Sequence, residues 1–365
     1  MKIVCLYQVI MHYRLPFYTK MSEDSELEFT LVYGHGKKGT KLVNTNTEYV
    51  KFNHIKLKDY RIPLPFSPKL LSTLIKLNPD IVFSEGSSSL INSSIAFLYA
   101  KVFKKKFIWW SLGSLKDDKK KGIRKLISHW ENVIERSSDA IFTYSSQGQN
   151  HFIERGVKRE KIFVGVNVFD TSLKLKEIEE TFEEGYISKN SFNIVFIGTI
   201  QKTKNLELLI DVIQKMNSTH GKDCVKLHII GDGEYLDIVK KYSNGSDAVI
   251  FYGRINSGSS KIVKNSDVMV LPGLGGLAIV EGMLNSLPII TGYADGTELD
   301  LVDETNGAII QDMNFQNLYD KLDYYYRNRD SLKELGNNSF HKITTKYSFE
   351  NYYEVFKKMI NFVNN

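Results

Sequence analysis

Short apolar runs recur along this chain, and helical patterns separate most of them. The runs are Lys2–Tyr7, Phe29–Tyr33, Asp80–Ser84, Phe107–Trp110, Ala140–Tyr144, Asn193–Ile197, Lys226–Ile230, Val249–Tyr252 and Val268–Leu271. Runs of this length are typical of buried strands, and several of them end at glycine or serine. Strands that alternate with helices predict an α/β fold.

The most informative unit lies between Asp267 and Gly292. Its strand, Val268–Leu271, ends at Pro272 and a glycine loop, and a helical pattern starts at Leu277. Glycines let a backbone approach a ligand closely, and the first N–H groups of a helix attract phosphate. Glu281, one turn further on, can accept hydrogen bonds from a ribose diol. Such turns are common in α/β proteins, so this unit alone does not assign a function.

Three further strand ends carry glycine turns in the same half of the chain. The first runs from Gly198 to Asn205 and includes Lys204, the second is Gly231–Gly233, and the third is Gly253–Arg254. A lone lysine after a glycine turn is ordinarily a surface residue. Its place in a second strand–turn–helix unit favours a role for Lys204 at a phosphate.

In these turns the chain resembles the family 4 glycosyltransferases of GT-B fold. Pro272, Gly276–Leu277 and Glu281–Gly282–Met283 fall in register with the family's glycine loop. The resemblance implies two Rossmann-like domains that face a central cleft, with a C-terminal helix that crosses back to the first domain. The corresponding ranges are 1–170 for the acceptor-side domain, 171–191 for a linker, 192–345 for the nucleotide-sugar domain and 346–365 for the crossover helix.

The resemblance also implies roles for individual residues of the second domain. Lys204 would act on the donor's pyrophosphate and Glu281 on its ribose, and these two are the expected catalytic residues. Donor binding is expected from Gly198, Thr199, Lys202, Gly231, Gly253, Arg254, Gly273, Gly275, Gly276, Leu277 and Ala278. Two positions depart from the family, because Gly273 replaces a Glu that touches the donor sugar and Thr199 replaces a pyrophosphate-binding Arg. Lys202 or Arg254 is expected to supply part of the missing charge.

Acceptor contacts are expected in the first domain, from His12, Arg14 and Gly113. The aromatic residues around His12 and Arg14 are equally consistent with simple packing of the first helix. Many family members carry a His beside the glycine at position 113, whereas this chain has Ser111 and Leu112. A histidine base is therefore absent there, which suits retaining enzymes that take no strong base from the protein.

The implied reaction is transfer of a sugar, with retention of configuration, from a UDP-linked donor to a glycan acceptor. A lipid-pyrophosphate-linked oligosaccharide of O-antigen, capsule or exopolysaccharide is the expected acceptor, and no cofactor or metal is expected. A nucleotide-sugar epimerase, a polyol-phosphate transferase or a non-catalytic nucleotide-sugar-binding protein on the same scaffold remain alternatives. A dinucleotide oxidoreductase is disfavoured, because Lys2–Tyr7 leads into no Gly-x-Gly-x-x-Gly turn.

Length and composition predict the number of domains and the compartment in which the protein acts. A chain of 365 residues favours two domains, and its 42% hydrophobic and 25% charged residues are those of a soluble protein. No signal peptide and no apolar run near 20 residues is visible, and the two cysteines suit a reducing compartment, so we expect the cytoplasm.

The basic residues are unevenly distributed. Residues 1–170 hold 27 Lys and Arg against 16 Asp and Glu, whereas residues 171–365 hold 21 against 26. Three basic clusters stand out: Lys104–Lys106, Lys119–Lys121 and Lys37–Lys41. Each can be ordinary solvated surface, or together they can attract the protein to anionic lipid at the inner face of the cell membrane. Nucleic acid is not expected, since stacking aromatics do not interleave with the basic runs.

Overall fold

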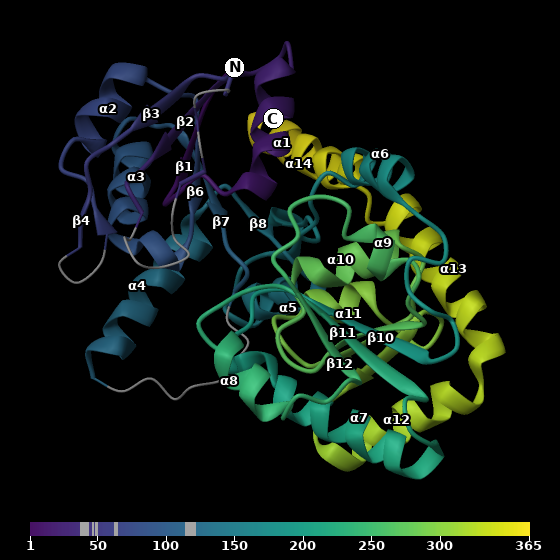
Figure 1. Ribbon diagram of the computed structural model, residues 1–365. Helices are drawn as coiled ribbons and strands as arrows, with labels where there is room; N and C mark the ends of the chain where they lie inside the picture. Colours follow the sequence, from purple (N-terminus) through teal and green to yellow (C-terminus); the bar gives the residue numbers. More distant parts are fainter. Residues whose placement is uncertain (37–43, 46, 48–49, 62–64, 114–121) are drawn as a thin grey trace. The chain divides into compact units, whose positions relative to one another are not determined.

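A computed structural model describes residues 1–36, 44–45, 47, 50–61, 65–113 and 122–365. The chain divides into two compact units (Figure 1). Unit 1 comprises Met1–Asp170 and Glu350–Asn365, and unit 2 comprises Thr171–Phe349. Of the basic clusters, Lys37–Lys41 and Lys119–Lys121 lie outside the described residues.

Unit 1 is built on a parallel sheet of seven strands. In spatial order these are β3 (His54–Lys56), β2 (Glu28–Tyr33), β1 (Lys2–Tyr7), β6 (Ile81–Glu85), β7 (Lys106–Trp110), β8 (Ala140–Thr143) and β9 (Ile162–Val164). Its helices are α1 (Leu15–Glu23), α2 (Leu70–Leu77), α3 (Leu90–Val102), α4 (Ile123–Ser137), α5 (Ser146–Glu154) and α14 (Phe349–Asn364). Two further short strands of unit 1, β4 (Tyr60–Arg61) and β5 (Pro65–Phe66), pair with each other in antiparallel orientation.

Aromatic packing ties α14 into unit 1. The ring of Phe356 lies 5.2 Å from that of Phe17 in α1 and 5.7 Å from that of Phe83 in β6. Phe83 also stacks on Trp110, with 4.7 Å between centroids. Aromatic pairs of this kind add to the stabilisation from apolar burial. The expected C-terminal helix is therefore present and contributes to the core of the first unit.

Unit 2 is a second parallel sheet, with six strands. Their order is β12 (Val249–Gly253), β11 (Val225–Ile230), β10 (Phe192–Ile197), β13 (Val268–Leu271), β14 (Ile289–Gly292) and β15 (Gly307–Ile310). Its helices are α6 (Thr171–Thr181), α7 (Leu206–His220), α8 (Leu236–Tyr242), α9 (Ser260–Val263), α10 (Leu277–Leu284), α11 (Thr297–Leu301), α12 (Phe315–Arg327) and α13 (Arg329–Thr345).

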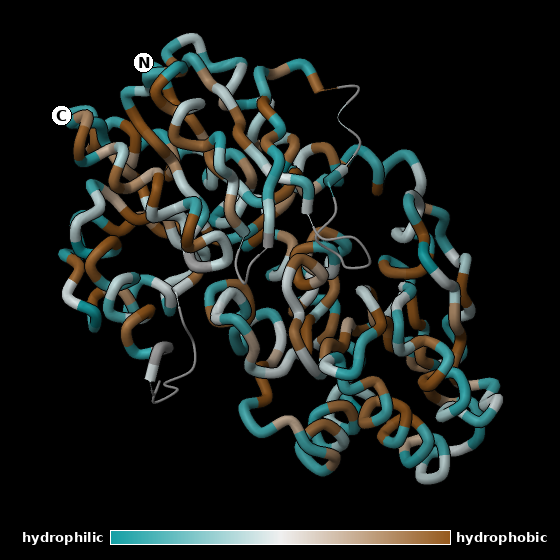
Figure 2. The backbone as a smooth tube through the Cα atoms, turned by 90° about the vertical axis from the view of Figure 1, so that its left-hand side faces the viewer, coloured by the Kyte–Doolittle hydropathy of each residue, from teal (hydrophilic) through white to brown (hydrophobic). Residues whose placement is uncertain are grey.

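The helices of unit 2 pack on this sheet and on one another. Figure 1 shows α7 and α12 side by side, and α13 packs on α10. Along the helices hydrophilic and hydrophobic residues alternate, as the change between teal and brown in Figure 2 shows. This pattern buries one face of each helix and leaves the other in water. The segment 171–191, expected as a linker, instead contains a helix, α6, which packs on α9 and α10.

Buried His228 in β11 gives unit 2 a pH-dependent stability. Its Nδ1 lies 2.9 Å from the Tyr252 hydroxyl and its Nε2 lies 3.0 Å from Oδ1 of Asn193. Burial, together with nearby Lys226, lowers the pKa of this imidazole from 6.5 to about 4. The unfolded chain takes up a proton near pH 6.5 and the folded chain only near pH 4, so stability falls as the pH drops through this window.

We expect the imidazole to account for up to about 3 kcal/mol of lost unfolding free energy between pH 7 and pH 4. His228→Gln should reduce this pH dependence, measured by urea unfolding at several pH values. The comparison uses the slope against pH and not the absolute stability, because the substitution itself disturbs a buried site. If the unfolding free energy depended on pH equally in both proteins, His228 would not be the group responsible.

Candidate functional site

The candidate site lies where the strand order of unit 2 reverses. The chain builds β10, β11 and β12 in one direction across the sheet and then returns to add β13 on the other side of β10. At such a point the connections leave in opposite directions beyond the carboxyl ends of two neighbouring strands, which opens a crevice for a ligand. The turns after β10 and β13 are those that the sequence analysis selected.

The turns after β10, β11 and β12 touch one another. A Cβ atom at Gly231 would lie 1.9 Å from the carbonyl oxygen of Gly198, so a larger residue does not fit there. The N–H of Gly231 donates to the carbonyl of Gly253 at 2.8 Å. The three glycines that the sequence predicts for donor binding thus form one continuous backbone surface.

The glycine loop after β13 packs tightly against the turn that contains Lys204. A Cβ atom at Gly273 would lie 2.0 Å from the carbonyl oxygen of Thr203 and 3.0 Å from the Cα atom of Lys204. Lys204 donates a hydrogen bond from Nζ to the carbonyl of Leu274. The structure therefore brings Lys204 to the loop and explains why a Glu cannot occupy position 273 in this arrangement.

Helix α10 begins directly after this loop, at Leu277. Gly276, its N-cap, has φ +55°, and among the described residues no side chain caps the helix. The N–H groups of Ala278 and Ile279 make only long turn bonds, of 3.3 and 3.2 Å. N–H groups at a helix start carry partial positive charge, so this end of α10 suits an anion.

Glu281 lies one turn into α10 and is only 8% exposed. Its Oε1 accepts a hydrogen bond from the Ser259 hydroxyl at 2.9 Å and lies 3.0 Å from Nζ of Lys174. Lys174 belongs to α6, which the sequence analysis treated as linker. Neither contact was predicted, because no local pattern links residues that are 22 and 107 positions away.

The side chains of the other predicted donor residues are more exposed to solvent. Lys202 is exposed, Thr199 is half-buried, and Arg254 is exposed with its Nε 3.1 Å from Oδ1 of Asn256. Lys202 lies two residues from Lys204 on the same short helical turn, Lys202–Lys204. Gly275 packs against Ile279, so its lack of a side chain has a structural reason as well.

In unit 1, His12 is exposed, as an acceptor contact requires. Gly113 has φ +81°, and a Cβ atom there would lie 2.9 Å from the ring of His151 in α5. The sequence did not indicate a contact between His151 and this turn. The structure places an imidazole against the turn where the family pattern has one, although it comes from a different element.

Arg14 differs from its expected role at the surface. The side chain is 2% exposed, its Nη1 donates to the Tyr352 hydroxyl at 2.8 Å, and its guanidinium lies 4.7 Å from the ring centroid of Trp110. Cation–π contacts and this hydrogen bond hold it inside unit 1, beside α14. The expected acceptor contact is therefore corrected to a packing role, because the aromatic rings around Arg14 enclose it.

Within the described ranges no helix is long and apolar enough to cross a membrane. In the same part of the chain, no three His, Cys, Asp or Glu residues gather as a metal site.

Residues 177–342 match the family model described as "Glycosyl transferases group 1". An uncharacterized 41.2 kDa protein in the cps region of Klebsiella pneumoniae is 23% identical, over 65% of this chain and 67% of that protein. The O-antigen biosynthesis glycosyltransferase WbnH of Escherichia coli is also 23% identical, over 63% of this chain, and the match spans less than two thirds, 62%, of WbnH.

Among solved structures, Anabaena Alr3699/HepE in complex with UDP superposes with a TM-score of 0.78. The alignment covers 99% of this chain and all of that one. At 14% identity, this similarity shows a shared fold and nothing more. Residues 177–342 are thus similar to the group 1 glycosyl transferases, and the chain, with its two Rossmann-like parallel sheets, has the GT-B fold.

Proposed function

We propose that this chain transfers a sugar from a UDP-linked donor to a glycan acceptor during the synthesis of a bacterial surface polysaccharide. The observation that carries this proposal is the convergence of Lys204, the glycine loop and the start of α10 at the strand-order reversal of unit 2. An ammonium group and uncapped helix N–H groups around one point suit a diphosphate. The names of the relatives, which include an O-antigen glycosyltransferase, support the same reaction class.

In the proposed reaction the bond between the anomeric carbon and the diphosphate oxygen breaks. The acceptor hydroxyl bonds to the same face of the sugar, and its proton passes to an oxygen of the departing phosphate, so that configuration is retained. Negative charge grows on the diphosphate, and Lys204 with the N–H groups of Gly276 and Leu277 stabilises it. Preorganised donors of this kind contribute up to about 3 kcal/mol each. Glu281 holds the ribose.

Uracil as the base is supported by the UDP bound to the similarly folded HepE. The acceptor is proposed to be a lipid-pyrophosphate-linked oligosaccharide, on the strength of the surface-polysaccharide names among the relatives. Catalysis is proposed to need neither a metal nor a cofactor, because Lys204 and the start of α10 supply the positive charge that a metal would otherwise provide.

The test is incubation of the purified protein with UDP-sugars, with and without a lipid-linked oligosaccharide, in the presence of EDTA. We expect a glycosylated lipid, UDP as the second product and an α-linkage from an α-linked donor, read by NMR. An altered UDP-sugar formed without acceptor would identify an epimerase. UDP-sugar binding with neither transfer nor slow hydrolysis would identify a binding protein.

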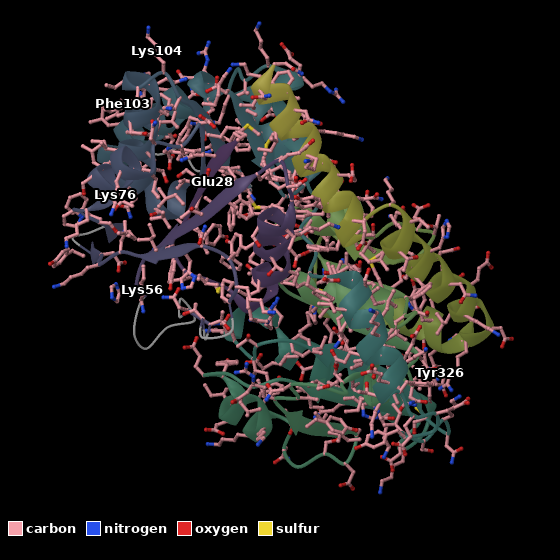
Figure 3. The ribbon with its side chains drawn as sticks, turned by 90° about the horizontal axis from the view of Figure 1, so that it is seen from above. Glu28, Lys56, Lys76, Phe103, Lys104 and Tyr326 are labelled. Carbon is pink, nitrogen blue, oxygen red and sulfur yellow. The ribbon has the colours of Figure 1, made fainter. Side chains whose placement is uncertain are left out.

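A basic and apolar surface of unit 1 supports a peripheral membrane position. Val102, at the end of α3, is 74% exposed, and the next residue, Phe103, is 47% exposed. Phe103 and Lys104 follow α3 and lie at the same end of this unit (Figure 3). Apolar side chains beside lysines suit an anionic lipid surface. We therefore propose that this surface docks on the cytoplasmic face of the cell membrane.

Val102→Glu combined with Lys104→Glu should weaken binding to phosphatidylglycerol-containing vesicles at least about tenfold, since each surface charge contributes about 1 kcal/mol. Co-sedimentation at low and high salt measures this. Leu299→Glu, at an exposed apolar residue of unit 2, is the matched control and should bind normally. Equal sedimentation of both variants would exclude this surface as the docking site.

A further inference from the structure

Helix α6 connects Glu281, the acid expected at the ribose, with the loop that follows β12. Nζ of Lys174 lies 3.0 Å from Oε1 of Glu281 and 3.1 Å from Oε2 of Glu177, one turn further along α6. Oε1 of Glu177 in turn accepts hydrogen bonds from the Gly258 N–H at 3.0 Å and from the Ser257 hydroxyl at 3.3 Å. One lysine thus bridges two carboxylates: Glu281 in α10, and Glu177, which holds the loop after β12.

The contacts to Glu281 are asymmetric. Lys174 and Ser259 both engage Oε1, whereas Oε2 makes no hydrogen bond within the part of the chain that the structure describes. A carboxylate with one oxygen fixed cannot turn freely about its terminal torsion. The second oxygen therefore keeps one direction and retains its lone pairs for another donor, such as a sugar hydroxyl.

Burial distinguishes this contact from an ordinary surface ion pair. The side chains of Lys174 and Glu281 are 15% and 10% exposed, so water screens their attraction little. Burial would raise the pKa of Glu177, but its bonds to the Gly258 N–H and to Lys174 lower it overall. Glu177 is therefore ionised at neutral pH, and Lys174 separates it from Glu281.

We infer that Lys174 is a positioning residue of the donor site: through Oε1 it orients Glu281 so that Oε2 receives the 2′- and 3′-hydroxyls of the nucleotide's ribose. This inference rests on the proposed function, because it takes Glu281 as the ribose ligand. It assigns a functional role to α6, which is not part of the glycine-turn pattern. Lys174 itself does not touch the nucleotide.

The test compares UDP with 2′,3′-dideoxy-UDP, which lacks the hydroxyls in question. Calorimetric titration of Lys174→Met should show about tenfold weaker binding of UDP and unchanged binding of the dideoxy compound. Lys174→Arg, which keeps the charge, should restore most of the UDP affinity. Lys176→Met, at an exposed lysine of the same helix, is the matched control and should bind both ligands normally.

A double substitution separates positioning from general destabilisation. In a Glu281→Ala background, Lys174→Met should have no further effect on UDP binding, since it would act only through the missing carboxylate. Equal weakening of both ligands, or an additive effect in the double variant, would overturn the inference. If the unmodified protein bound no UDP, the proposed function itself would fail, whereas UDP binding unaffected by Lys174→Met would refute only the positioning role.

Discussion

Lys204→Ala is expected to abolish sugar transfer while the protein remains folded. The lysine is the last residue of a 3₁₀ turn, and its Nζ donates to the carbonyl of Leu274 in the glycine loop, where the departing diphosphate is proposed to lie. Loss of one preorganised cation should lower kcat at least about 100-fold, since a group of this kind contributes about 3 kcal/mol to the transition state. Initial rates of UDP release with a lipid-linked acceptor measure the effect.

Two controls make this result specific. Lys215→Ala removes an exposed lysine from the following helix, α7, and should leave turnover unchanged. Circular dichroism and thermal unfolding should match for both variants and the unmodified protein. Normal turnover in Lys204→Ala would show that the charge on the diphosphate is neutralised by another group.

Gly273→Glu restores the acid that the family pattern has at this position, and we expect it to inactivate this protein. The Cβ atom alone would lie 2.0 Å from the carbonyl oxygen of Thr203, on the turn that carries Lys204. Overpacking against backbone costs about 1–3 kcal/mol and moves the surrounding segments. The glycine loop and Lys204 should therefore separate, with a lower unfolding temperature and weaker UDP binding.

Gly273→Ala introduces the same clash without the charge and should act in the same direction, more weakly. Gly185→Ala serves as control, because Gly185 has φ +76° but no neighbour within 4 Å of a Cβ atom. It should cost about 1–2 kcal/mol of stability through backbone strain and leave UDP binding intact. Higher activity in Gly273→Glu would show that the loop can adopt the arrangement of the family pattern.

The nine apolar runs of the sequence are strands in the structure, with ends within one residue of the predicted ones, whereas the short strands β3 and β15 were not predicted. The run Asn193–Ile197 is β10 at Phe192–Ile197, and Val268–Leu271 is β13. These elements follow from local patterns, because an apolar run bounded by glycine leaves few alternatives in water. The polar segment 171–191 had no apolar run, and its helix α6 could not be recognised because packing on α9 and α10 stabilises it.

The sequence by itself determined the order of strands, glycine turns and helices, and with it the resemblance to the group 1 glycosyl transferases and the places of Lys204 and Glu281 in that order. Only the tertiary structure decided that Arg14 is enclosed by aromatic rings, that Gly273 must be glycine and that Lys174 contacts Glu281. The physical reason is distance along the chain. Periodicity and turn chemistry act over a few residues, whereas these three results depend on side chains and carbonyls that only the folded sheet brings within a few ångströms.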